Sequence, residues 1–134
     1  MIDESHQVVN LQFIAADGTK RFLSGGRKKG CFSTIGKVTD TILIAEGWAT
    51  GASLYETTSH NVVVGMDAGN LESVAKVIRK LHPTAKIIIC ADNDPVGVEK
   101  ATVAAFACNG LYIAPPNEDM DFNDFINAGG VVYG

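Results

Sequence analysis

From residue 41 onward, the sequence alternates between short apolar runs and stretches with a helical period. The apolar runs cover residues 42–45, 62–66, 86–91 and 111–114, and a stretch of helical character follows each of them. Such alternation is typical of an α/β domain whose strands are mostly parallel, with helices on both faces of the sheet. We therefore predict an α/β fold with a mostly parallel sheet of about four strands and flanking helices.

The predicted helices cover about residues 49–57, 71–81, 95–108 and 122–128. The second has the clearest pattern, because its apolar residues stand at positions 71, 74, 75, 78 and 81, the spacing of one buried face. Asn70 directly precedes this helix and is the residue type that caps helix N-termini, so we expect it to be the N-cap.

The first 37 residues have a different pattern. Two short runs of strand character, residues 8–14 and 20–23, flank a turn at residues 16–18 and predict a hairpin, and residues 31–36 predict a further short strand. We expect residues 1–37 to form a small antiparallel β segment that precedes the main α/β domain at residues 38–134.

Charge is also divided between these two parts. Residues 1–37 carry a net charge of +3 and the remaining residues −7, which gives the whole chain −4. A basic front beside an acidic body suits a protein that holds a polyanion next to a metal site, although a solvated charged loop gives the same pattern. The residues expected to contact nucleic acid or nucleotide phosphates are Lys20, Arg21, Arg27, Lys28 and Lys29.

Acidic residues follow two of the apolar runs. Glu46 follows residues 42–45, and Asp92 and Asp94 follow residues 86–91. Since the carboxyl ends of parallel strands meet at one edge of a sheet, these carboxylates are expected to converge there and to bind Mg²⁺. Two of them have an alternative role: Glu46 near a helix N-terminus, and Asp94, followed by Pro95, as an N-cap. Asp92 has none, because a carboxylate at the end of a buried strand needs a partner.

Two further acids, four aromatic residues and the cysteines have roles that the sequence indicates less directly. Asp121 is expected either to add a carboxylate to the same crevice or to cap the last helix, and Asp67 is expected to be a loop or capping acid. The aromatic residues Trp48, Tyr55, Phe106 and Tyr112 are expected in the core rather than as base-stacking platforms. The three isolated cysteines argue against a zinc site and favour a cytoplasmic setting, and no apolar stretch has the length of a membrane span.

The arrangement of a glutamate after the first core strand and an Asp-x-Asp after the third resembles the Toprim family. Residues 45–54 resemble the Glu-Gly-x-Ala-Thr segment of primases from phages, plasmids and satellite elements. Residues 12–30, 91–94 and 121–124 are similar to further segments of the same proteins.

The resemblance implies a Toprim fold and the catalytic core of a DNA primase. Glu46, Asp92 and Asp94 would be the catalytic acids that bind Mg²⁺ or Mn²⁺, and Asp121 an additional metal ligand. Many replicative primases carry another acid four residues after the glutamate, where this chain has Thr50. That departure leaves open how many metal ions are held.

The implied partners are a single-stranded DNA template, nucleoside triphosphates, and a helicase in the same or another chain, with no membrane. The chain is then expected to be a fragment of a longer cytoplasmic protein. Alternatives are a Toprim nuclease using the same metal, a non-catalytic nucleic-acid-binding Toprim module, and a phosphoacceptor-like domain. A topoisomerase fits less well, because the strand-breaking tyrosine of those enzymes lies in other domains.

Overall fold

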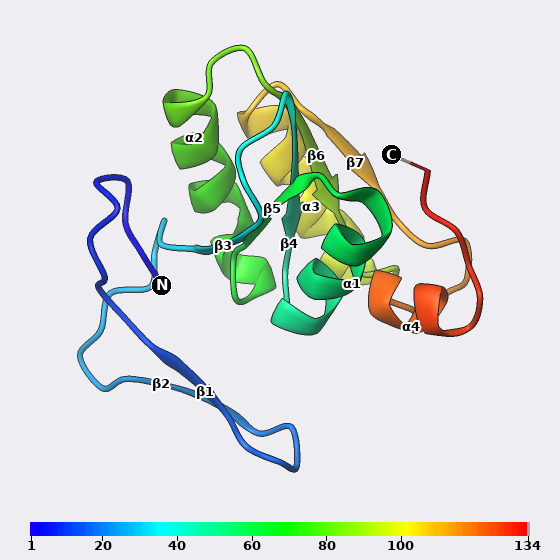
Figure 1. The fold of residues 1–134 in the computed structure, drawn as a ribbon, viewed down its shortest axis with the longest axis horizontal. Helices are drawn as coiled ribbons and strands as arrows, with labels where there is room; N and C mark the ends of the chain where they lie inside the picture. Colours follow the sequence, from blue (N-terminus) through cyan, green and yellow to red (C-terminus); the bar gives the residue numbers. More distant parts are fainter. Residues whose placement is uncertain (134) are drawn as a thin grey trace.

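The computed structural model describes residues 1–133 and contains one main sheet, a separate hairpin and four α-helices (Figure 1). The strands are β1 (Gln12–Ile14), β2 (Lys20–Phe22), β3 (Ser33–Ile35), β4 (Thr41–Ala45), β5 (Asn61–Val64), β6 (Lys86–Cys90) and β7 (Leu111–Ile113). The helices are α1 (Trp48–Thr58), the 3₁₀ turn η1 (Ala68–Asn70), α2 (Leu71–Leu81), α3 (Pro95–Ala107) and α4 (Phe122–Asn127).

The main sheet has five strands in the order β3-β5-β4-β6-β7. Strands β5, β4, β6 and β7 are parallel, as the alternation of strand and helix predicted, and β3 pairs antiparallel with β5 at one edge. The predicted hairpin of β1 and β2 is present and projects from the body in Figure 1. Strand β3 belongs to the first 37 residues but joins the main sheet, and the division at residue 37 stays a prediction.

The helices form one layer on each face of the sheet. Helices α2 and α3 pack together on one face, and α1 packs with α4 on the other (Figure 1). The central strands are therefore covered on both sides, which explains why β4 and β5 read as continuous apolar runs rather than as alternating ones. Among the described residues, no helix combines the length and the apolar character needed to cross a membrane.

Asn70 stands at the N-cap position of α2, which covers the predicted residues 71–81, but its side chain does not cap the helix as expected. Asn70 has helical backbone angles and its side chain makes no capping hydrogen bond, because η1 runs directly into α2. The buried Asn70 side chain instead contacts the loop between β2 and β3. Its Oδ1 accepts from the Gly30 amide at 2.8 Å, and its Nδ2 donates to the carbonyl oxygens of Lys28, Cys31 and Gly65.

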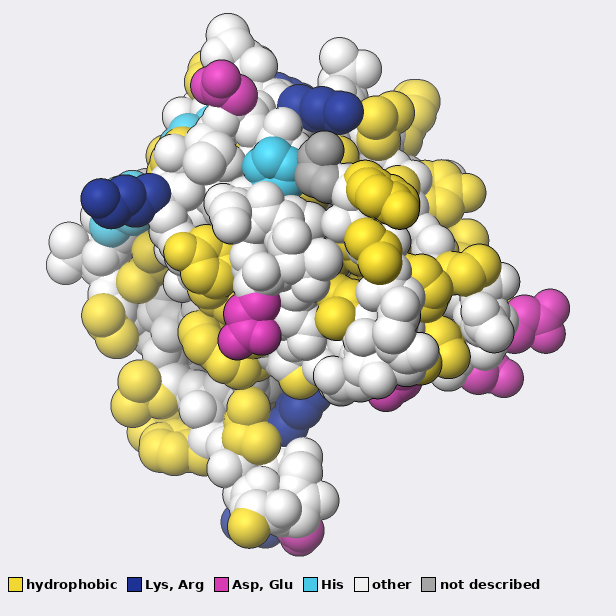
Figure 2. All heavy atoms as spheres, turned by 45° about the vertical axis from the view of Figure 1, so that its right-hand side comes forward, with side chains coloured by type: hydrophobic (Ala, Val, Ile, Leu, Met, Phe, Trp, Pro, Cys, Tyr) yellow, Lys and Arg dark blue, Asp and Glu magenta, His cyan; other side chains and the backbone are white. Residues whose placement is uncertain are grey.

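The expected burial of the four aromatic residues is also wrong. Trp48 is 42% exposed, Tyr55 37%, Phe106 90% and Tyr112 44%. The two core layers consist mainly of aliphatic and small side chains, and their buried aromatic residues are Phe32 and Phe122 instead. Figure 2 shows hydrophobic side chains at the surface over much of one face of the molecule.

Arg79, near the end of α2, has a structural role that the sequence did not indicate. Its guanidinium donates to five backbone carbonyl oxygens, those of Cys108, Asn109, His82, Pro83 and Ala85, at 2.7–3.3 Å. Carbonyl groups at the ends of helices lack partners within the helix, and a cation is well suited to satisfy them. Arg79 thereby connects the ends of α2 and α3.

We expect Arg79→Met to lower the free energy of unfolding by about 2–4 kcal/mol, because methionine keeps much of the aliphatic stem but removes every donor. Urea unfolding followed by circular dichroism measures the change. Lys80→Met is the matched control, since Lys80 is exposed and, within residues 1–133, its side chain pairs with Glu4 alone, so the change should alter stability by less than about 0.5 kcal/mol. Equal effects of the two substitutions would contradict this role for Arg79.

Candidate metal and nucleotide site

The parallel strands end in register, which brings three acid-bearing loops to one edge of the sheet. Ala45, the last residue of β4, pairs with Val64 of β5 on one side and with Cys90 of β6 on the other. Each of these strands is followed within three residues by an acidic side chain. The convergence predicted for the acids after β4 and β6 therefore also includes an acid after β5.

Glu46 lies between β4 and α1 and is partly buried at this edge. Burial is the main cause that raises the pKa of Glu46, and the negative charges of Asp67 and Asp94 raise it further. A hydrogen bond from the Ala68 amide and the positive charge of Lys20 act in the opposite direction. Glu46 thus faces other carboxylates rather than a cation that fully compensates its charge.

Asp92 is the most perturbed of these acids. Burial is the largest cause that raises its pKa from 3.8 to about 6. The charges of Glu46, Asp121 and Asp94 contribute in the same direction, and Lys20 opposes them. Its Oδ1 atom is buried, and no group among residues 1–133 forms a hydrogen bond with it. A buried carboxylate oxygen without a partner is costly, so a positive ligand at this atom would relieve the cost.

Asp94 is the N-cap of α3, as its position before Pro95 indicated. Its Oδ1 accepts a hydrogen bond from the Gly97 amide at 2.7 Å. Glycine is required there, because a Cβ atom on Gly97 would lie 2.5 Å from the Asp92 carbonyl oxygen. The close approach of α3 fixes the turn that carries both aspartates.

Asn93, between the two aspartates, attaches this turn to the loop before α4. Its side-chain amide donates to the carbonyl oxygens of Pro115 and Asn117, each at 2.9 Å. Its backbone exchanges hydrogen bonds with Met120 and Asp119. The loop that follows β7 therefore forms one wall of the crevice.

Asp121 lies at the end of that loop, and both of its carboxylate oxygens are engaged. Oδ1 accepts from the Asp124 amide at 2.7 Å and caps α4, which is one of the two roles expected from the sequence. Oδ2 accepts from the buried Thr50 hydroxyl at 3.1 Å. Asp121 is close enough to raise the pKa of Asp92, and its role as a metal ligand stays a prediction.

Asp67, which we expected to be a loop or capping acid, belongs to this edge of the sheet. It makes no side-chain capping bond, and its carboxylate forms an ion pair with Lys28. The sequence could have indicated this position, because Asp67 follows the apolar run of β5 just as Glu46 follows that of β4. The ion pair compensates Asp67, whereas Asp92 has no such partner within the described residues.

The five basic residues are not equivalent in the structure. Lys20 lies beside the acids, with its Nζ 3.8 Å from the position that a Cβ atom on Gly47 would take. Lys28 pairs with Asp67, and Lys28 and Lys29 line a pocket together with Asp67. Arg27 pairs with Asp3 at 2.7 Å.

Arg21 follows Lys20 on β2 and therefore points to the opposite face of the hairpin. The charge of Lys20 acts on Glu46 and Asp92, and Lys28 pairs with Asp67. Contact of all five basic residues with nucleic acid or nucleotides stays a prediction.

The acids fit a divalent cation chemically but do not form a ready-made cage. Within residues 1–133, no three His, Cys, Asp or Glu side chains are grouped closely enough to hold a metal ion by themselves. Mg²⁺ is commonly bound through one or two carboxylates, with waters and substrate phosphates completing its coordination. The oxygen ligands, the mutual repulsion of the carboxylates and the unpartnered Asp92 Oδ1 agree with such an incomplete site.

Comparisons with known proteins agree with the resemblance predicted from the sequence. The family described as "Toprim domain" matches residues 41–131. Two curated proteins named DNA primase TraC, both from Escherichia coli, are 38% and 35% identical over 119 residues, which cover 78% of this chain. This chain corresponds to only 8% and 11% of their lengths.

Two solved structures have the same fold. One is a structure of the bacteriophage T7 lagging-strand DNA polymerase interacting with primase domains of two gp4 subunits, bound to an RNA/DNA hybrid and dTTP. It superposes with a TM-score of 0.70 at 18% identity and covers 95% of this chain and 68% of that one. The other is a DNA primase domain from Pseudomonas aeruginosa, with a TM-score of 0.63 at 17% identity, covering 97% of this chain and 46% of that one.

Proposed function

This chain belongs to the Toprim family and is related to DNA primases, and on that premise we propose that it is the catalytic core of a DNA primase. The proposed reaction is metal-dependent nucleotidyl transfer, which synthesises short primers on single-stranded DNA. The observation that carries this proposal is the buried, unpartnered Asp92 Oδ1 beside Glu46, where two carboxylates repel each other. Such an arrangement costs folding stability and suits a site that binds a cation.

In this proposal Glu46, Asp92 and Asp94 hold Mg²⁺ or Mn²⁺, with Asp121 as a further ligand. A bound metal ion would neutralise the phosphates of the incoming nucleotide and help to activate the primer 3′-hydroxyl. One oxygen of Asp94 caps α3, and no hydrogen bond within residues 1–133 engages the other, so Asp94 can bind a ligand without releasing the helix. The chain's main contribution is to fix the acids at the strand ends, which is catalysis by positioning and charge.

Lys20 and Lys28 are proposed to contact the phosphates. Both are directed toward the acids, and Lys28 is held by its ion pair with Asp67 and lies 5.2 Å from the centre of the Phe22 ring. Arg21, Arg27 and Lys29 are then placed to contact the template backbone outside the crevice. Such contacts would not depend on base sequence.

The wider context is also proposed rather than observed. Residues 1–37 would act as the basic segment of the primase core and residues 38–134 as the Toprim domain. Because the chain spans about a tenth of the curated relatives' length, the remaining domains of a longer protein would supply further functions. A helicase in the same or another chain is among the proposed partners.

The proposal is tested by measuring primer synthesis by the chain on single-stranded DNA with nucleoside triphosphates and Mn²⁺ or Mg²⁺. We expect Glu46→Gln to lower synthesis by about 100-fold or more, since it removes one charged ligand of similar shape. Asp40→Asn is the matched control. Asp40 is exposed and directly precedes β4, at the end of the strand opposite to Glu46, so this variant should retain wild-type activity.

Two results would redirect the proposal. Metal-dependent cleavage of the DNA, without primer synthesis and lost in Glu46→Gln, would assign the site to a nuclease. Binding of DNA without either reaction, unchanged in Glu46→Gln, would assign the chain to a non-catalytic binding module.

A further inference from the structure

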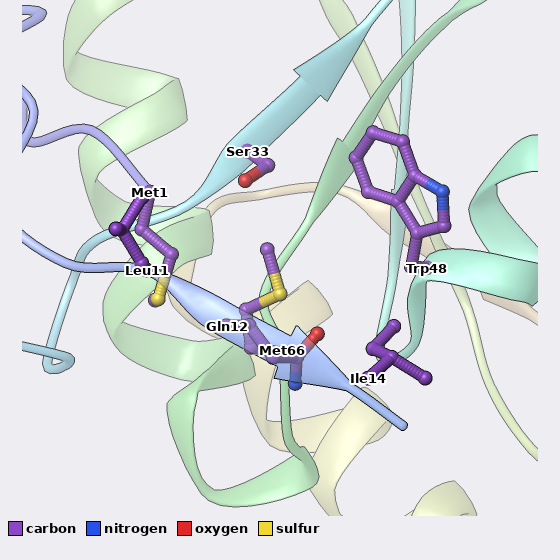
Figure 3. Close-up of a pocket in the computed structure, with 7 residues that line it drawn as sticks. All are labelled: Met1, Leu11, Gln12, Ile14, Ser33, Trp48 and Met66. Atoms are coloured by element: carbon purple, nitrogen blue, oxygen red, sulfur yellow. The ribbon is translucent and has the colours of Figure 1, made fainter. Parts of the chain in front are cut away.

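A pocket of about 390 Å³ lies between the β1–β2 hairpin and the main domain (Figure 3). One wall consists of Leu11, Gln12 and Ile14 from the hairpin segment, and the opposite side includes Trp48 and Met66. Its volume is within the range of small-molecule sites, roughly 300–1,000 Å³. Apolar side chains predominate, with the Gln12 amide and the Ser33 hydroxyl as the polar groups of its lining.

Trp48 and Met66 bring this pocket directly beside the acidic crevice. Trp48 is the first residue of α1 and is separated from Glu46 only by Gly47, while Met66 directly precedes Asp67. Met66 has a φ of 76°, a left-handed conformation that is unusual for a side chain of this size. Such backbone strain is found disproportionately at ligand sites, where the surrounding structure enforces it.

The hairpin connects the pocket to the positive charge at the acids. Ile14 of β1 is the cross-strand partner of Lys20 in β2, and Gln12 is the partner of Phe22. These four residues occupy one face of the hairpin, because side chains alternate along a strand. Ile14 and Gln12 line the pocket, while Lys20 lies beside Gly47. A ligand with an apolar ring and an attached phosphate could therefore place its ring in the pocket, against Ile14 and Gln12, and its phosphate beside Lys20.

We propose that the pocket binds an unpaired nucleobase, which stacks on the exposed indole of Trp48 and is enclosed by Ile14 and Met66. This inference rests on the proposed function, since it assigns the phosphates of the same ligand to Lys20 and the acid-bound metal. Base stacking on aromatic side chains accepts any base, because every base has a π-face. The ring belongs either to a template nucleotide or to an incoming nucleoside triphosphate.

Gln12 and Ser33 would contact the edge of that base. Within the part of the chain that the structure describes, no hydrogen bond engages the side chain of either residue. An amide and a hydroxyl each donate and accept, so together they can adapt to different bases. This pocket is therefore expected to favour a nucleobase over an abasic sugar-phosphate without selecting one sequence.

Trp48 is the single tryptophan of the chain, so its fluorescence reports on the pocket directly. We would titrate the protein, first in EDTA and then with Mg²⁺, with a 12-nucleotide oligothymidylate, with an abasic oligonucleotide of equal length, and with ATP. Stacking is expected to quench the emission with the oligothymidylate or ATP, but not with the abasic strand. Quenching by the oligothymidylate alone assigns the base to the template, and quenching by ATP alone assigns it to the nucleotide.

Substitutions provide the second measurement. Binding of a fluorescein-labelled form of the quenching ligand, followed by anisotropy, should weaken about 5- to 150-fold in Trp48→Ala, corresponding to ~1–3 kcal/mol for one stacked base. Trp48→Phe should recover much of the affinity. Phe106→Ala is the control, because Phe106 is an exposed aromatic residue of α3 outside the pocket lining, and it should bind like the wild type.

The base site would be overturned by equal quenching with the abasic strand, by no quenching in either EDTA or Mg²⁺, or by unchanged binding in Trp48→Ala. These failures are distinguishable from failure of the proposed function, because quenching and anisotropy measure binding and require no primer synthesis. Quenching without primer synthesis would retain the base site and reject the primase. Primer synthesis with unchanged binding in Trp48→Ala would retain the primase and reject the base site.

Discussion

Asp92→Asn is expected to make the metal-free protein more stable at pH 8 while abolishing its response to Mg²⁺ or Mn²⁺. The folded-state pKa of Asp92, about 6, lies above its ordinary value of 3.8, because burial and neighbouring acids disfavour its charge. Between these values the folded protein binds more protons than the unfolded chain, so the unfolding free energy contributed by Asp92 falls as pH rises. Asparagine carries no charge and escapes this penalty.

The gain in unfolding free energy should be about 1–3 kcal/mol above pH 7, and it should fall to a small part of that at pH 4, where Asp92 is protonated in the folded state and about half protonated in the unfolded chain. Urea unfolding of the wild type and the variant in EDTA at pH 4 and pH 8 measures it. A loss of stability in the variant at pH 8 would mean that the Asp92 carboxylate has a compensating partner in solution, contrary to the structure.

The same pair of proteins tests the metal site. A ligand that binds only the folded state raises the melting temperature, so divalent metal with a nucleoside triphosphate should stabilise the wild type. It should not stabilise Asp92→Asn, whose melting temperature should stay constant. Asp40→Asn, which alters an exposed acid at the opposite end of β4, should respond like the wild type. An equal response of all three proteins would place the metal elsewhere.

Asn70→Ala is expected to lower the free energy of unfolding by about 2–4 kcal/mol. The Asn70 side chain is 3% exposed and connects three segments, which are the loop between β2 and β3, the end of β5 and the start of α2. Alanine would leave the Gly30 amide and several carbonyl oxygens without this partner, and each buried unsatisfied group costs about 1–3 kcal/mol.

Asn70→Asp should be at least as damaging, because its carboxylate would face the three carbonyl oxygens that now accept from Nδ2. Urea unfolding measures both variants. Asn127→Ala is the control, since Asn127 is exposed on α4 and should tolerate the change within about 0.5 kcal/mol. Stability of Asn70→Asp equal to that of the wild type would show that these contacts are replaceable.

Asn70 also positions a residue of the site. It holds the backbone of Lys28, whose side chain pairs with Asp67 at the acidic edge. We infer that Asn70 is a positioning residue for the basic loop. Asn70 holds the N-cap position that the sequence predicted, but its side chain does not cap α2. The physical reason is that the carboxamide accepts from the Gly30 amide and shares its two N–H groups among three carbonyl oxygens, whereas capping would satisfy one or two local amides.

Local sequence determined most of the fold. The apolar runs, their lengths and the helical period between them depend on short-range patterning, and the structure has the four predicted parallel strands, the hairpin and helix α2 over the predicted residues. The convergence of Glu46 and Asp92 was also predictable. Parallel strands end at one edge, so an acid immediately after a strand has little freedom in where it lies.

Tertiary structure decided which side chains compensate one another. Lys28 and Asp67 pair across the loop that Asn70 holds from about 40 residues away, and β3 reaches β5 to form the antiparallel edge. Trp48 lies outside the two core clusters and lines a pocket together with residues of the hairpin. None of these contacts has a local period or spacing that would reveal it. They arise from close packing between distant segments, which only the folded chain specifies.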